Sequence, residues 1–176
     1  MYLTTKQKTI KYVCYCLILI AADLLQNTQG LFPQIFGARC FLLLPLAITI
    51  AMGEEIIAAS FLGLFAGLLW DITAPVHLGF NCIFIAVVCF LSSALATYIV
   101  RDIFVTNMIC CAVVTVLYCL LYWLFFIVIR GVDGGEYTLY SFYLPCAVYT
   151  LVISPLIWLI MRPVKRKLNF EKSVEI

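Results

Sequence analysis

Long runs of apolar residues, interrupted by few charged ones, constrain the fold of this chain more than any other feature. Six such runs occur in the 176 residues, at about 10–25, 39–52, 55–70, 81–100, 106–129 and 141–161. A helix needs about 20 mostly apolar residues to cross the ~30 Å hydrocarbon core of a bilayer. Hydrophobic residues make up 65% of the chain and charged residues only 11%, whereas roughly a quarter of a soluble domain is charged. The sequence therefore predicts an all-α, polytopic membrane protein. We expect about six transmembrane helices, arranged as one bundle in a single domain, residues 1–176.

The second and third runs are the shortest of the six. The second carries Pro45, and Gly53, Glu54 and Glu55 separate it from the third. Both runs are short for a perpendicular crossing, so tilted, partly re-entrant and bilayer-thinning arrangements are all open. Because carboxylates are costly at the bilayer centre, we expect residues 53–55 to form a tight turn near the membrane interface.

The distribution of Lys and Arg predicts the orientation of the spans. If six spans run in order from a cytoplasmic N-terminus, nine of the eleven basic residues lie on the cytoplasmic side. These nine are Lys6, Lys8, Lys11, Arg101, Arg162, Lys165, Arg166, Lys167 and Lys172, and the two outer ones are Arg39 and Arg130. This asymmetry follows the positive-inside rule. It favours an even number of spans, with both termini and the basic tail 162–176 in the cytoplasm.

Residue types that perform catalysis or bind metals are sparse in this chain. Nine cysteines lie mostly within apolar runs without a CxxC pair, and His77 is the only histidine, so a metal site is not predicted. The glutamate pair 54–55 suggests an intramembrane protease of the CAAX type. However, the predicted topology puts this pair and His77 on opposite sides of the membrane. We therefore expect no enzyme activity, no cofactor and no metal.

A stripe of small residues that ends in a carboxylate is the most informative local pattern. Gly63, Gly67 and Asp71 are spaced four apart and share one helix face. The GxxxG spacing lets helix backbones approach closely, either within the bundle or against a partner helix. Asp71 lies near the C-terminus of its helix, where the helix dipole disfavours an anion. It is either solvated or a hydrogen-bond acceptor for Asn81 or for backbone N–H groups near Gly79.

A second carboxylate, Asp23, raises the same question in the first run. It lies near the same outer face as Asp71 in the predicted topology. An ionisable residue within a span is a functional candidate by default. The Asp23 position also argues against a cleavable signal peptide, because an acidic residue interrupts the apolar run and no A-x-A cleavage pattern follows.

Residues 60–95, SFLGLFAGLLWDITAPVHLGFNCIFIAVVCFLSSAL, resemble the signature region of the MreD family of bacterial rod shape-determining membrane proteins. That family has a glycine-rich span ending in aspartate, a small polar loop with Leu-Gly, and a long apolar span. Gly63, Gly67, Asp71, Leu78 and Gly79 fall on this pattern. The end of the chain, ISPLIWLIMRPVKRKL, also resembles the family's last span and basic tail. Two features depart from the family: Pro45 lies inside the second run, and the acidic 53–55 turn has no counterpart.

The resemblance implies a non-catalytic scaffold in the bacterial cytoplasmic membrane. Members of the MreD family associate with MreC, which has one span and an extracytoplasmic domain. Through MreC they join a penicillin-binding transpeptidase, a SEDS glycosyltransferase and the MreB filament, which together build the lateral peptidoglycan. From the helix-face and carboxylate arguments above, we expect Gly63, Gly67, Asp71, Gly79, Asn81 and Asp23 to serve helix packing or partner contact.

A transporter subunit is the alternative function. The substrate-binding S components of energy-coupling-factor vitamin transporters are also small proteins with about six spans, and we expect an S-component-like bundle. Such a protein needs polar residues from several spans that converge near the outer face. Asp23 and Asp71 are candidates for lining such a pocket, whereas the later spans offer few polar groups beyond Ser, Thr and Tyr.

Overall fold

The computed structural model describes residues 5–28, 40–73, 79–99, 103–129, 131, 137 and 139–168. The described part of the chain is helical and contains no strand. Its main helices are α1 (Thr5–Asn27), α2 (Leu43–Ala51), α3 (Ile56–Thr73), α4 (Phe80–Tyr98), α5 (Phe104–Trp123) and α7 (Leu144–Leu168). Two π-helical turns, η1 (Leu124–Val128) and η2 (Leu139–Tyr143), extend α5 and α7.

Five helical segments are long and apolar enough to cross a membrane. They are Lys6–Asn27, Ile56–Thr73, Phe80–Tyr98, Phe104–Val128 and Leu139–Leu168. This confirms the prediction of an all-α, multi-pass membrane protein. The last segment is longer than predicted, because the helix continues through Arg162 and the following basic residues to Leu168.

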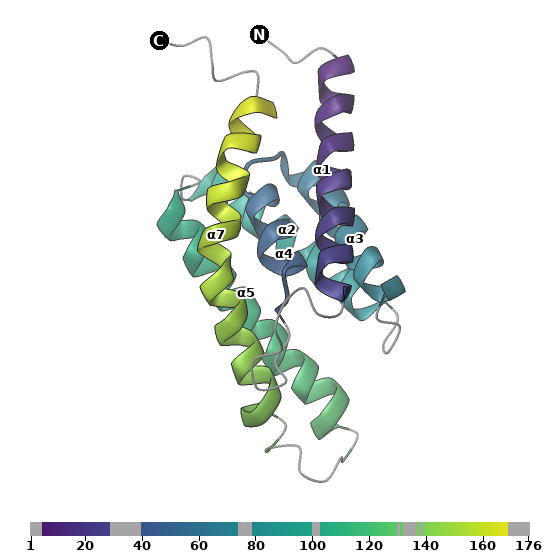
Figure 1. The fold of residues 1–176 in the computed structure, drawn as a ribbon, viewed down its shortest axis with the longest axis vertical. Coiled ribbons are helices and arrows are strands. Elements are labelled where there is room, and N and C mark those ends of the chain that lie inside the picture. Colours follow the sequence, from purple (N-terminus) through teal and green to yellow (C-terminus); the bar gives the residue numbers. More distant parts are fainter. Residues whose placement is uncertain are drawn as a thin grey trace.

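The second predicted span, residues 39–52, is not a full crossing. Its helix, α2, has nine residues and is therefore about 14 Å long, roughly half the hydrocarbon core. All nine residues are buried, and α2 packs against α1, α3, α4, α5 and α7. Figure 1 shows α2 inside the bundle. The sequence left open whether this run crosses the membrane fully, because an apolar run looks the same in sequence whether it faces lipid or protein.

Side chains from the surrounding helices form hydrogen bonds with backbone groups at both ends of this buried helix. A short helix leaves backbone N–H and C=O groups unpaired at its ends, and water is scarce inside a membrane bundle. At the start of α2, the Leu43 N–H donates to Gln26 of α1 at 2.9 Å. At the other end, the Lys165 ammonium of α7 donates to the Thr49 carbonyl at 2.9 Å. A cation at this end also complements the helix dipole, so α1 and α7 together hold α2 in place.

The two ends of the bundle differ in chemistry. α1 begins and α7 ends at the same end, at the top of Figure 1, where Lys11 pairs with Glu54 and Lys165 caps α2. We call this the basic end. At the opposite end, which we call the aspartate end, Thr73 donates to Asp23 and Gly79 donates to Asp71. Beyond the aspartate end, α5 and α7 continue as a protruding pair (Figure 1).

Candidate helix-packing and partner-contact site

Gly63 and Gly67 bring α3 and α4 into close contact. A Cβ atom added at Gly63 would lie 2.7 Å from the Cys89 Cβ and 2.8 Å from the Ile85 carbonyl oxygen. At Gly67 it would lie 2.5 Å from the carbonyl oxygen of Asn81. Both glycines are buried, and both face α4. Of the two roles left open by the GxxxG pattern, the structure therefore uses packing within the bundle, and neither glycine is available to a partner helix.

Asp71 accepts three hydrogen bonds from the start of α4. Its Oδ2 accepts from the backbone N–H groups of Gly79 and Cys82, each at 3.0 Å. Its Oδ1 accepts from the Asn81 Nδ2, also at 3.0 Å. Asp71 is buried, with 3% of its surface exposed. The hydrogen bonds expected from Asn81 and from the backbone near Gly79 are thus present.

These contacts make Asp71 the N-terminal cap of a helix other than its own. The first N–H groups of a helix lack intrahelical partners, and a carboxylate placed there also interacts favourably with the helix dipole. Asp71 is unfavourably placed for the dipole of α3, but it meets the positive end of α4. Gly79, the residue before α4, has φ +93°, a left-handed conformation that favours glycine. This turn directs the Gly79 N–H towards the carboxylate.

Tyr118 connects this hydrogen-bond network to α5. Its hydroxyl donates to the Asn81 Oδ1 at 2.8 Å, so Asn81 connects Asp71 to α5. The Tyr118 ring stacks on Trp70, with ring centroids 5.3 Å apart, and meets Phe41 edge-on at 5.4 Å. A carboxylate, an amide, a phenol and packed rings thus tie α3, α4 and α5 together at the aspartate end. The sequence contains many aromatic residues, and nothing in it distinguished Tyr118 from the others as a hydrogen-bond partner of Asn81.

Asp23 connects α1 to α3 at the same end. Its Oδ1 accepts from the Thr73 hydroxyl at 3.2 Å and from the Asn27 Nδ2 at 3.1 Å. Only 2% of Asp23 is exposed. The two aspartates therefore have parallel tasks, because each joins the end of α3 to a neighbouring helix.

An ion pair at the basic end was missed by the sequence analysis. The Lys11 Nζ lies 2.7 Å from the Glu54 Oε1, and the two side chains are 7% and 2% exposed. We expected residues 53–55 to form a simple interfacial turn. The turn is present, but Glu54 points into the bundle. The only sequence signal was the presence of opposite charges at the same predicted end.

Two features of this turn show how tightly the basic end is packed. A Cβ at Gly53 would stand 2.8 Å from the Lys165 Nζ, so glycine makes room for the lysine that caps α2. Burial raises the pKa of Glu54, and this effect exceeds the opposing influence of Lys11 and, to a smaller degree, Lys165. The buried Glu54 carboxyl is thus paired with a lysine that is itself buried.

The residues around these two networks offer no arrangement for metal binding. Within the described ranges, no three His, Cys, Asp or Glu side chains are placed to hold a metal ion. All nine cysteines carry free thiols. His77, Leu78, Arg39 and Arg130 lie outside the described residues.

The surface available to lipids or partner helices is apolar. On α3 an exposed stripe runs opposite the glycine face, and it consists of Ile57, Phe61, Leu64, Leu68 and Ile72. Its spacing of three and four residues keeps it on one side of the helix. Such a stripe suits the contact of one helix with another, as well as contact with lipid chains.

Comparison with models of known protein families, with curated proteins and with solved structures gave no match. The geometry of the site, together with the resemblance of residues 60–95, is therefore the basis for any functional conclusion.

Proposed function

We propose that this protein is an MreD-like, non-catalytic scaffold of the bacterial cell-elongation complex. In this proposal it lies in the cytoplasmic membrane with its basic end and both termini in the cytoplasm. It supports lateral peptidoglycan synthesis and cell shape through helix–helix contacts with an MreC-like, single-span partner. The wall-synthesis enzymes and the MreB filament join through that partner.

The observation that carries the proposal is the MreD-like segment 60–95 and the unit that it forms. Gly63 and Gly67 close the α3–α4 contact, and Asp71 caps α4 through three hydrogen bonds. The residues that match the family pattern and are described thus serve one structural purpose, which is to fix α3 against α4. A rigid pair of this kind keeps its outward stripe in a constant shape, which is what a scaffold needs to bind another helix.

The distribution of polar groups also favours a scaffold. Asp71 is fully engaged by protein donors, and Asp23 accepts from Thr73 and Asn27. The transporter alternative would use these two aspartates to line a substrate pocket. It therefore has less support, because a substrate would have to replace the hydrogen bonds that hold the helices together.

The test is affinity purification of the tagged protein from its native membrane in mild detergent, followed by mass spectrometry. Recovery of a single-span protein with an extracytoplasmic domain, together with wall-synthesis enzymes, is the expected result. Recovery of a pair of ATPases with a shared membrane coupling subunit would overturn the proposal and favour the transporter alternative.

Variants of α3 make this test sharper. Gly67→Leu should reduce recovery of the complex, because it separates α3 from α4. Val113→Phe on α5 is the matched control, since 60% of Val113 is exposed and it lies outside the α3 stripe. Glu136→Ala, between the fifth and the last predicted spans, should also leave recovery unchanged. Equal recovery with Gly67→Leu and with both controls would contradict the assigned role of the α3–α4 pair.

A further inference from the structure

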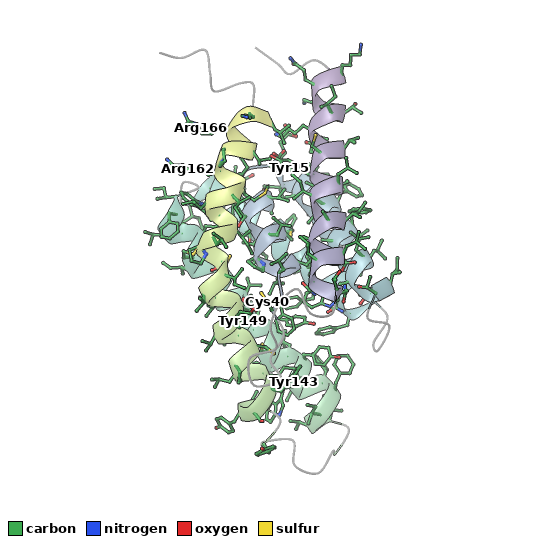
Figure 2. The ribbon with its side chains drawn as sticks, in the orientation of Figure 1. Tyr15, Cys40, Tyr143, Tyr149, Arg162 and Arg166 are labelled. Carbon is green, nitrogen blue, oxygen red and sulfur yellow. The ribbon has the colours of Figure 1, made fainter. Side chains whose placement is uncertain are left out.

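The last turns of α7 carry two exposed arginines on one side of the helix. Arg162 and Arg166 are four residues apart and both are exposed, whereas Lys165 between them is buried and caps α2. Figure 2 shows both arginines projecting from the same side of α7, away from α1. The four cations of this segment therefore have different places: Lys165 serves the fold, Arg162 and Arg166 form an exposed pair, and Lys167 is exposed on another side of the helix.

An aromatic pair fixes the first of these arginines. The Arg162 guanidinium lies over the Trp158 ring, 5.2 Å from its centroid. Trp158 in turn meets Phe104 of α5 edge-on, with centroids 5.0 Å apart. A guanidinium stacked on a ring keeps its N–H donors free around its edge. Arg162 is thus positioned on a rigid surface with its hydrogen-bond donors available to a ligand.

An apolar stripe leads from the arginines towards the middle of the membrane. The exposed fractions of Val152, Leu156 and Leu159 are 68%, 57% and 64%. At 1.5 Å per residue, Val152 lies about 15 Å from Arg162 along the axis, which matches the ~15 Å depth of one leaflet. Spacings of three and four residues place the stripe and both arginines on one face of α7.

We propose that Arg162, Arg166 and this stripe form a binding site for an anionic phospholipid. The headgroup phosphate sits between the two guanidinium groups, which suit phosphate oxygens through paired N–H donors. The acyl chains lie along Leu159, Leu156 and Val152. A lipid with net negative charge is favoured over a zwitterionic one, because the latter brings a cation of its own to a doubly cationic site. This inference does not depend on the proposed scaffold function.

The test is a lipid titration of the purified, detergent-solubilised full-length protein followed by native mass spectrometry. Phosphatidylglycerol and phosphatidylcholine with identical acyl chains serve as probes. We expect the protein to retain phosphatidylglycerol in preference to phosphatidylcholine. The double variant Arg162→Gln/Arg166→Gln should weaken phosphatidylglycerol binding about thirtyfold, at about fivefold per cation near the surface.

A matched variant separates a local site from general attraction to the basic end. Lys6→Gln/Lys8→Gln removes the same charge from exposed positions of α1 and should weaken binding much less. Equal weakening by the two double variants would overturn the proposal, as would equal retention of both lipids. Displacement of phosphatidylglycerol by an equal concentration of inorganic phosphate would also overturn it, because the arginines would then bind phosphate without a contribution from the acyl chains.

Discussion

Replacing Gly67 with alanine is the most direct test of the α3–α4 contact. The added Cβ would lie 2.5 Å from the Asn81 carbonyl oxygen and 2.8 Å from the Asn81 carbonyl carbon, whereas ordinary contact begins at 3.4 Å. Both neighbours are backbone atoms of α4, so no side-chain rotation can relieve the overlap. The two helices must instead move apart by close to an ångström.

That movement also affects Asp71, because Asn81 and Cys82 are the residues that Gly67 touches. Their hydrogen bonds to Asp71 are 3.0 Å long, and an increase of this size puts them beyond hydrogen-bonding distance. Overpacking costs about 1–3 kcal/mol, and a lost hydrogen bond to a charged group about 1.5–3 kcal/mol. In the opposite direction, alanine stabilises the helix by about 1 kcal/mol relative to glycine, because its helix propensity is higher. With one such hydrogen bond lost, we therefore expect Gly67→Ala to lower the free energy of unfolding by about 1.5–5 kcal/mol.

The assay is thermal unfolding of the purified protein in detergent, followed by tryptophan fluorescence. Trp70 lies close to the altered contact and packs against Tyr118, so its fluorescence reports on the α3–α4 contact at the aspartate end. The expected change is a decrease in Tm of roughly 3–20 °C. Leu68→Phe adds a comparable volume at an exposed neighbouring position and should leave Tm nearly unchanged. A Gly67→Ala protein that unfolds at or above the wild-type Tm would refute the reasoning, since the propensity gain would then be the only effect.

Four further predictions concern the two polar networks, and unfolding in detergent measures all of them. Asp71→Asn should lower the stability by about 2–4 kcal/mol. Both carboxylate oxygens of Asp71 accept hydrogen bonds from N–H groups, and in asparagine an NH2 group, which cannot accept, would replace one of these oxygens. Tyr118→Phe should cost about 1 kcal/mol, since it removes one hydrogen bond and keeps the ring. Lys11→Met should cost about 3 kcal/mol by leaving Glu54 without its cation, and Lys11→Met/Glu54→Met should recover much of this loss. Because the pKa of Glu54 is raised in the folded protein, stability should decrease as pH rises from the usual carboxyl value of 4.5 through the raised pKa.

Conservative changes nearby provide the controls for these predictions. Glu55→Gln removes a carboxylate that is exposed, so it should leave the stability unchanged, whereas Glu54→Gln should remove the decrease with pH. Asp71→Asn without loss of stability would show that the cap of α4 is dispensable. A Lys11→Met/Glu54→Met protein less stable than Lys11→Met alone would contradict the pairing of these two charges.

Local properties of the sequence were enough to determine the membrane class and most of the helices. The five long segments follow from their length and apolar composition. The proximity of Asp71 to Asn81 and Gly79 was also predictable, because a helix end and the start of the next helix are joined by a short loop. Lys11 and Glu54 were expected at the same end, although the sequence gave no reason to pair them.

Only the tertiary structure decided which faces of the helices meet. In a bilayer the interior of the bundle and its lipid-facing surface are both apolar, so hydropathy does not distinguish them. The burial of α2 and the direction of Gly67 towards α4 were therefore open in the sequence. Asp71 could be recognised as an acceptor, but its favourable place at the N-terminus of α4 depends on how two helices approach. The approach distance is set by small residues and by polar groups that must find partners away from water, and these are contacts between segments rather than properties of one segment.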